Sequence, residues 1–330
     1  MYEQSQVFDE LASEWNDLLK RSATDAIFCT WEWQSAWWQT YDAGKLWVVA
    51  CRDDDGRLIG IAPWFIQPKE GESVVRTIGC VDVTDYVDLI IDHDHIDAVL
   101  DEFAGFLVNH RDAYDRVNLC NIPETSPTYA LFVDKLKARG LDAKVELQEV
   151  CPVIKLPGTW DEYLDSLDKK QRGEIRRKLR RAEGEGDIEW YIVGREHDQN
   201  AEFDRFLDLM AASHPEKREF LNDPKNLAFF KCILPLMAAQ GWLKLSFLKV
   251  NGTAAATYCD FDYNNQILVY NSGLDPNAYA QLSPGIVLLS YNIRAAIETG
   301  HSVFDFLRGN ETYKYRMGGQ DTRVYMLLAQ

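Results

Sequence analysis

Residues 267–319 read ILVYNSGLDPNAYAQLSPGIVLLSYNIRAAIETGHSVFDFLRGNETYKYRMGG, and this stretch decides the fold. Its apolar runs predict a strand at 267–271, a helix at 286–299 and a second strand at 303–306. Ser283 suits the N-cap of the helix and Pro284 its first position, while Gly300 suits the position after its end. The order strand, loop, helix, strand is typical of an α/β unit.

The start of this helix is a candidate anion site. Backbone N–H groups and the positive end of the helix dipole point from there toward the preceding loop. An ordinary, well-capped crossover helix explains the same pattern. Polar and aromatic residues directly after the second strand, among them Asp305, Arg308, Tyr313, Lys314 and Tyr315, favour a functional site.

An ordered set of motifs resembles the CelD/BcsL-type branch of the GNAT acyltransferases, which is similar to the FemAB-type transferases. The set comprises FCTWEW at 28–33, DYVD at 85–88, SLDKKQR at 166–172, NSGLDP at 271–276, SPG at 283–285 and the run 305–318. The resemblance implies an α/β protein of two tandem GNAT-like domains, with mixed sheets flanked by helices. Domain boundaries are predicted at 1–150, on the acceptor side, and 151–330, on the donor side.

The same resemblance implies acyl transfer, with acetyl as the first candidate, from coenzyme A to an amine on a sugar, amino acid, lipid or polysaccharide. The stretch Tyr270, Asn271 and Ser272 would supply a backbone N–H to the carbonyl oxygen. The phosphates would lie at Gln281, Ser283 and Gly285, although residues 281–285 keep only part of the usual GNAT phosphate loop. Arg308 and Lys314 are further candidates for donor binding.

Three residues are candidates for catalytic roles. Asp305 is the candidate base for the acceptor amine and Tyr313 the candidate acid for the leaving thiolate. Asp88, a carboxylate inside an apolar run, would bind the acceptor in a cleft that the resemblance implies between the two halves. The alternatives are structural: Asp305 pairs with Arg308 or a backbone N–H, the tyrosine rings pack, and Asp88 is a turn residue.

Composition limits the classes of function. The chain has 330 residues and a formal net charge of −17, which argues against general DNA binding. No apolar run is long enough to span a bilayer and no signal peptide is recognised, so we expect a cytoplasmic protein. The seven cysteines are scattered and are interpreted as reduced, small hydrophobic residues.

Residues 169–181 contrast with this acidity, because they contain eight basic residues and one acid, Glu174. Apolar residues recur at helical spacing, which predicts a helix with a basic face. A solvated face is one interpretation. The other is an anionic partner, such as coenzyme A phosphates, a sugar nucleotide, a charged polysaccharide or tRNA.

One other cluster of possible ligands and two rival functions are compatible with parts of the sequence. His93, Asp94 and His95 lack the spacing of a metal motif and are interpreted as loop residues, so no metal is expected. One rival function is a FemAB-like transferase that uses aminoacyl-tRNA. The other is a GNAT scaffold without catalysis, as a glycan-binding or regulatory protein in cellulose or exopolysaccharide synthesis.

Overall fold

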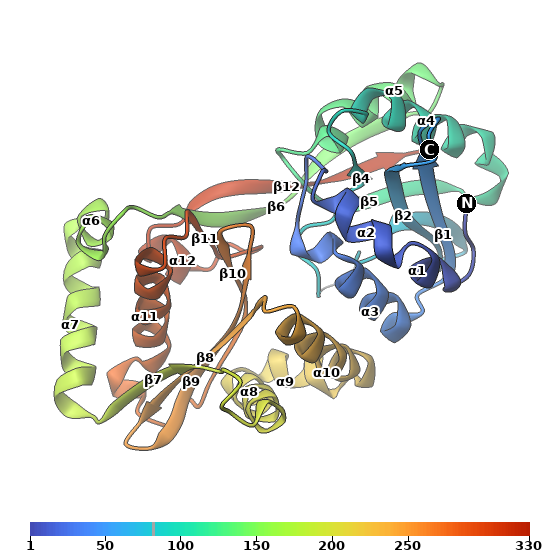
Figure 1. Ribbon diagram of the computed structural model, residues 1–330. Coiled ribbons are helices and arrows are strands. Elements are labelled where there is room, and N and C mark those ends of the chain that lie inside the picture. The colour runs from blue at the N-terminus through green and yellow to red at the C-terminus, as the bar shows by residue number, and fades with distance from the viewer. Residues whose placement is uncertain (81–82) are drawn as a thin grey trace. The chain divides into compact units, whose positions relative to one another are not determined.

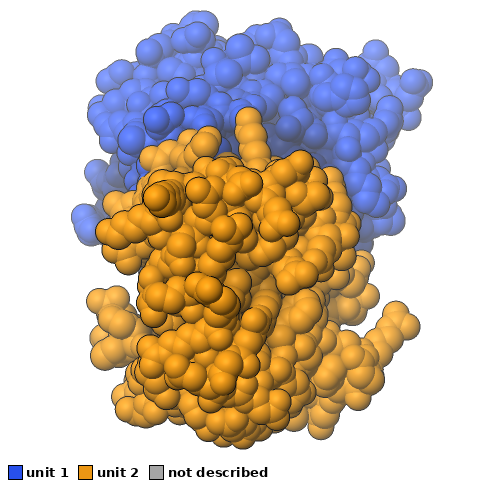
Figure 2. Space-filling model, turned by 90° about the vertical axis from the view of Figure 1, so that its left-hand side faces the viewer, with its two compact units in different colours: residues 1–150, 322–330 blue, residues 151–321 orange. Residues whose placement is uncertain are grey.

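The computed structural model describes residues 1–80 and 83–330 and divides the chain into two compact units. Unit 1 comprises Met1–Val150 and Thr322–Gln330, and unit 2 comprises Cys151–Asp321 (Figures 1 and 2). The sequence-based boundary keeps residues 322–330 in the second domain. The structure places them in unit 1 because strand β12 (Gln320–Ala329) pairs antiparallel with β5 (Arg116–Pro123).

Unit 1 is built on a mixed sheet. Its strand order is β1-β2-β3-β5-β12-β6, and the short β4 pairs with β2. The remaining strands are β1 (Lys45–Arg52), β2 (Leu58–Lys69), β3 (Glu72–Thr77), β4 (Ile90–Ile91) and β6 (Ala143–Lys155), and the helices are α1 (Gln6–Glu10), α2 (Ala12–Leu19), α3 (Trp31–Tyr41), α4 (Ile96–Asn109) and α5 (Val133–Ala138). Helix α4 packs its apolar face on this sheet, and most tryptophans of the N-terminal half are buried.

Unit 2 continues from the second half of β6. Its strand order is β6-β11-β10-β9-β8-β7. The strands are β7 (Ile188–Ile192), β8 (Leu243–Val250), β9 (Thr253–Tyr263), β10 (Gln266–Leu274) and β11 (Val303–Asp305), and the helices are α6 (Trp160–Ser166), α7 (Lys169–Glu185), α8 (Gln199–Ser213), α9 (Pro215–Asn222), α10 (Pro224–Ala239), α11 (Pro284–Glu298) and α12 (Thr312–Arg316). Helices α6, α7 and α11 cover one face of the sheet and α8, α9 and α10 the other (Figure 1).

The centre of unit 2 is an incomplete pairing of two parallel strands. β10 pairs with β11 only from Gln266 to Leu268, opposite Val303 to Asp305. β10 then runs on to Leu274 beside β9, with a bulge between Val269 and Asn271. From the bulge onward, one edge of β10 is therefore not paired with β11, and this edge faces the loop that follows β11.

One prediction about the cysteines is wrong. Cys80 and Cys120 form a disulfide, with their Cα atoms 5.9 Å apart, whereas the sequence predicts seven reduced cysteines. A disulfide depends on distance in the fold, and these residues are 40 positions apart in the chain. Cys29, Cys51, Cys151, Cys232 and Cys259 are free.

Within the described residues, no helix combines the length and the apolar character that crossing a bilayer requires.

Gly273 should be essential for packing β10 against α8. A Cβ atom built there would lie 2.4 Å from the backbone nitrogen of Met210 and 2.5 Å from the carbonyl carbon of Leu209. Gly273→Ala should therefore lower the free energy of unfolding by about 1–3 kcal/mol. Gly173→Ala is the control, because a Cβ there meets nothing within 4 Å, and alanine favours the helix by up to about 1 kcal/mol. Equal stability of the two variants in chemical denaturation would contradict this close approach.

Candidate active site

Helix α11 begins at Pro284, directly after Ser283. Ser283 has a left-handed backbone, with φ of 54°, and its side chain makes no capping hydrogen bond. The sequence predicts Ser283 as an N-cap, and it holds that position without the side-chain bond, because such a cap normally needs an extended backbone. The positive end of the α11 dipole therefore has no side-chain cap.

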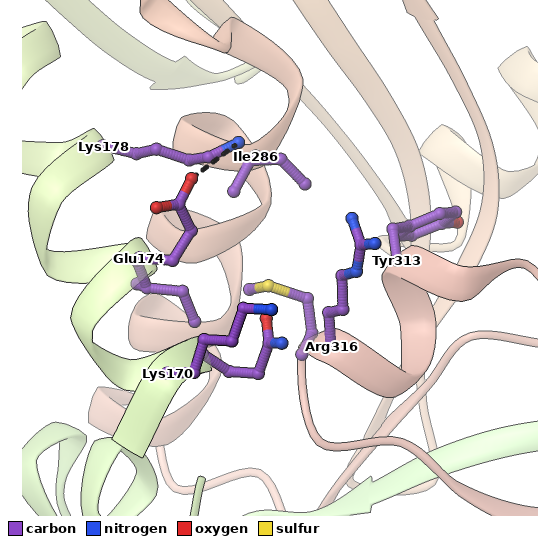
Figure 3. Close-up of a pocket in the computed structure, with 9 residues that line it drawn as sticks. Lys170, Glu174, Lys178, Ile286, Tyr313 and Arg316 are labelled. Atoms are coloured by element: carbon purple, nitrogen blue, oxygen red, sulfur yellow. Dashed lines mark ion pairs between the residues drawn. The ribbon is translucent and has the colours of Figure 1, made fainter. Parts of the chain in front are cut away.

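A cavity of about 330 Å³ lies beside the first turn of α11. Three helices of unit 2 form its walls: α7, the start of α11 and α12 (Figure 3). Its lining residues are Lys170, Gln171, Glu174, Ile175, Lys178, Ile286, Tyr313, Arg316 and Met317. The basic helix and the loop after β11, which are far apart in the sequence, thus share one cavity.

The cavity is electropositive. Lys170, Lys178 and Arg316 line it, with Glu174 as the acid among its lining residues. Glu174 accepts hydrogen bonds from Arg177, which lowers the pKa of its carboxyl group, and it lies 3.8 Å from Lys178. Three cations near a helix N-terminus are the donor set that phosphate groups prefer.

The loop after β11 is held by two buried side chains. The Asp305 carboxylate accepts a hydrogen bond from the backbone N–H of Leu307 at 2.7 Å. Lys314 is buried, and its Nζ donates to the carbonyl oxygens of Leu307, Arg308 and Gly309 and pairs with Glu311 at 2.9 Å. Lys314 is a predicted donor-binding residue, but in this structure its ammonium group holds the loop together.

Tyr313 lies between this loop and the cavity. Its ring contacts Phe306 edge to face and lines the cavity with Ile286 of α11. Burial raises the pKa of its hydroxyl, and the carboxylates Glu311 and Asp260 act in the same direction. The hydroxyl is therefore a proton donor at neutral pH.

Asp305 and Tyr313 belong to different sides of the sheet. Phe304 and Phe306 pack in the core beneath α11, so the intervening Asp305 projects to the opposite face. Tyr313 is on the α11 side, where the cavity lies.

On the face opposite α11, β10 contacts a lysine that the sequence did not single out. Lys217 of α9 donates from Nζ to Asn271 Oδ1 at 3.0 Å and to the Ser272 carbonyl oxygen at 2.5 Å. Tyr270, at the bulge, packs its ring against Phe230 and Phe261. The three residues predicted to lie near the carbonyl of the donor thus sit on the part of β10 that pairs with β9 but not with β11.

The remaining predicted residues have these positions. Gln281 is exposed in a 3-10 turn, Ala280–Leu282, before α11. Gly285 lies in the first turn of α11, and a Cβ there would come no closer than 3.6 Å to a neighbour.

Asp88 lies in unit 1, where it is buried and accepts a hydrogen bond from Ser126. Burial raises the pKa of its carboxyl group. Its role in acceptor binding stays a prediction.

A second cavity of unit 2, of about 150 Å³, lies near the end of α11 and includes Asp260. Burial raises the pKa of Asp260 well above its usual value, and Asn292 donates to one of its oxygens at 3.1 Å. The polar groups of this cavity come from β8, β9, the second half of α11 and the residues just after it, and none of them was predicted as a site residue.

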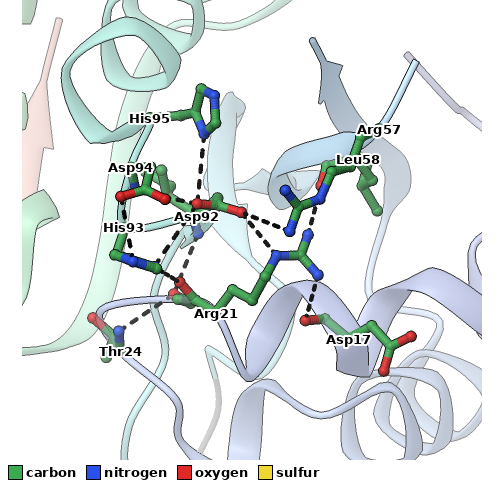
Figure 4. Close-up of polar contacts among 11 residues, drawn as sticks. Asp17, Arg21, Thr24, Arg57, Leu58, Asp92, His93, Asp94 and His95 are labelled. Carbon is green, nitrogen blue, oxygen red and sulfur yellow. Dashed lines mark hydrogen bonds and ion pairs between the residues drawn. The ribbon is translucent and has the colours of Figure 1, made fainter. Parts of the chain in front are cut away.

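The aspartate–histidine cluster of unit 1 forms an ion-pair network (Figure 4). Asp92, His93 and Asp94 place ligand atoms close together. Arg21, however, already pairs with Asp92 at 2.8 Å, and Arg57 lies 3.8 Å away. Burial alone would raise the pKa of Asp92, but the hydrogen bonds from Arg21, the Asp94 backbone and His95 outweigh it and lower the pKa to about 2. Two guanidinium groups already lie at the Asp92 carboxylate and would repel a metal ion, so we assign no metal to this cluster.

Comparison with known proteins finds a family match within unit 2. Residues 169–315 match the family model described as "Acetyltransferase (GNAT) domain". This segment runs from the start of α7 into α12 and contains most of the residues that line the basic cavity; Arg316 and Met317 lie just beyond it. No curated protein matches the sequence.

Solved structures show the same fold over nearly the whole chain. FemX has a TM-score of 0.67 at 13% identity, covering 99% of this chain and 96% of its own. A conserved protein of unknown function from Bacteroides thetaiotaomicron has a TM-score of 0.62 at 12% identity, with 96% of both chains covered. L-PGS from Bacillus licheniformis has a TM-score of 0.57 at 12% identity, covering 96% of this chain and 90% of its own.

These findings confirm the predicted fold class, an α/β protein with GNAT-like architecture. The match over residues 169–315 supports an enzyme of the acyltransferase class. The CelD/BcsL branch is a finer assignment that the matches do not test.

The two lysines that line the cavity should matter more for a phosphate ligand than other cations of α7. Lys170→Gln with Lys178→Gln should weaken coenzyme A binding about tenfold or more, since charged hydrogen bonds contribute about 1.5–3 kcal/mol. The salt dependence of binding should also become shallower. Calorimetry at several salt concentrations measures both effects.

The matched control is Arg180→Gln with Arg181→Gln, which removes the same charge from positions of α7 outside the cavity lining. Equal weakening by both pairs would mean that only the overall charge of the helix matters.

Proposed function

We propose that the protein transfers an acyl group, acetyl in the first place, from coenzyme A to an amine acceptor. The observation that carries this proposal is the separation of β10 from β11 beside an electropositive cavity at the start of α11. The acetyltransferase match over 169–315 supports the same reaction. Under this proposal unit 2 binds the donor, and the assignment of residues 1–150 to the acceptor side stays part of the proposal.

The donor fits the residues present. Lys170, Lys178 and Arg316 would hold the phosphates beside the first turn of α11, where Gly285 leaves space. The unpaired edge of β10 near Ser272 would face the thioester, and its polar groups would stabilise negative charge on the carbonyl oxygen. Coenzyme A supplies a thioester, which is an activated acyl group.

Positions on the two faces of the sheet match the two proton transfers. Asp305 projects to the α9 side and would accept the proton of the amine. Tyr313, on the cavity side and kept protonated by its raised pKa, would give its proton to the leaving thiolate. Attack and departure thus proceed from opposite faces.

The rival donor is aminoacyl-tRNA. Two observations favour it: the basic face of α7 and the likeness in fold to FemX, which agrees with the FemAB-type resemblance. The acidic net charge favours coenzyme A. The acetyltransferase domain argues against a non-catalytic scaffold. A cytoplasmic location and a role in exopolysaccharide synthesis remain proposals.

A thermal-shift screen distinguishes these donors. Acetyl-coenzyme A, a longer acyl-coenzyme A and tRNA are added separately to the protein. Stabilisation by either coenzyme A ester supports the proposal, because a ligand that binds only the folded state raises its stability. Stabilisation by tRNA alone would reject coenzyme A as the donor.

The acid and base roles predict a specific kinetic pattern. Asp305→Asn and Tyr313→Phe should each lower kcat by about 10²–10⁴-fold, with little change in donor affinity. Because its pKa is raised, Tyr313 should add no limb to the pH–rate profile below about pH 10. Tyr315→Phe, on the same short helix but exposed, is the control and should turn over normally.

The competing interpretation makes Asp305 a structural residue, since its carboxylate holds the Leu307 N–H. It predicts that Asp305→Asn lowers both the melting temperature and kcat. A stable but inactive Asp305→Asn supports the base, and normal turnover in a stable variant removes Asp305 from the mechanism.

A further inference from the structure

Lys217 is a mostly buried cation whose hydrogen bonds go to uncharged oxygens. Its Nζ donates to Asn271 Oδ1 at 3.0 Å, to the Ser272 carbonyl oxygen at 2.5 Å and to Ser272 Oγ at 3.3 Å. Among the residues that the structure describes, no carboxylate forms an ion pair with it. Burying an ammonium group without a carboxylate partner is unfavourable, and burial lowers the pKa of Lys217 to about 8.

Glu311 is the acid that acts on Lys217 from a distance and opposes this shift. Its carboxylate is already paired with Lys314 at 2.9 Å, and its side chain is 56% exposed. Lys314, by contrast, has both an acid and three carbonyl oxygens around it. Within the described residues, Lys217 is therefore a partly buried cation of this region that has no anion at contact distance.

The position of Lys217 points to the acceptor. It contacts β10 at Asn271 and Ser272, beyond the last residue pair with β11 and on the face covered by α8, α9 and α10. The cations proposed for the donor phosphates lie on the α11 face. A ligand group at Lys217 thus belongs to the molecule that approaches from the side to which Asp305 projects.

We propose that Lys217 binds an anionic group of the acceptor, so that the acceptor is an amine that also carries a carboxylate or a phosphate. This proposal rests on the proposed acyl transfer. The anion supplies the charge partner that the fold does not, while the amine stays free to react. Neutral amines of the same shape lack this contact and are poorer acceptors.

Matched acceptors test the proposal and distinguish the two anions. Glycine is compared with glycinamide, and glucosamine 6-phosphate with glucosamine, each with acetyl-coenzyme A. The anionic member of at least one pair should have the higher kcat/KM. In Lys217→Met that preference should fall about tenfold or more, as expected for the loss of a charge–charge contact in a partly buried site. Lys217→Arg keeps the charge and should retain part of the preference.

Lys231→Met is the control, because Lys231 is exposed on the adjacent helix α10. It should leave the preference unchanged. Melting temperatures of all variants show whether they fold. A folded Lys217→Met that keeps the full preference overturns the proposal, and so does a wild type that prefers the neutral member of both pairs.

A binding measurement remains decisive if no acceptor turns over. N-acetylglycine and N-acetylglucosamine 6-phosphate are titrated while side-chain NMR follows the ammonium group of Lys217. A bound anion should raise the pKa of Lys217, whereas neutral N-acetylglucosamine should not. In the free protein, anion affinity should fall as the pH rises above about 8, because Lys217 then loses its charge. Glu311, itself paired with Lys314, is the charged group whose field acts on Lys217.

Binding of an anion without turnover would support the anion site and reject the proposed reaction. Turnover without either preference or pKa change would keep the reaction and reject this role of Lys217.

Discussion

The short pairing between β10 and β11 is the constraint on which unit 2 depends. Two parallel strands that continued side by side would satisfy each other's backbone groups and close the sheet. Here β11 ends at Asp305, while β10 bends at its bulge and continues beside β9 to Leu274. The backbone beyond the bulge must find other partners, and Lys217 supplies one to the Ser272 carbonyl. The part of β10 beyond the bulge thus keeps its hydrogen bonds although β11 does not continue beside it.

The loop after β11 provides the second wall of this opening, and its rigidity has a local cause. Leu307 has a left-handed backbone, with φ of 57°, which is unfavourable for a leucine. The hydrogen bond from its N–H to Asp305 and the buried Lys314 offset this strain. Tyr313 is consequently placed at the cavity by a loop whose conformation is fixed from within. Any catalytic use of Asp305 has to be reconciled with this structural duty, and variants must be judged by stability and rate together.

Much of the fold could be predicted from local patterns. Helix α11, the β8–β9 hairpin and the basic helix α7 follow from spacing, capping and turn residues that lie next to one another in the chain. Contacts between distant segments could not be predicted in this way. Lys217 meets Ser272 across 55 residues, and β12 returns to pair with β5 in unit 1. Helix α9 is only eight residues long, so its apolar positions gave too weak a period to be recognised.

The charges of the site show why composition alone misleads. The basic face of α7 suggested one continuous anion-binding strip, but its residues differ in their surroundings. Arg177 is held by Glu174 and Arg181 by Glu185, whereas Lys170 lines the cavity. Exposed ion pairs of this kind contribute little to stability and are weakened by salt. Lys217 on α9 differs from these arginines, because it is partly buried and forms no ion pair with a carboxylate of the described residues. An anion would therefore stabilise Lys217 more than it would an exposed, paired arginine.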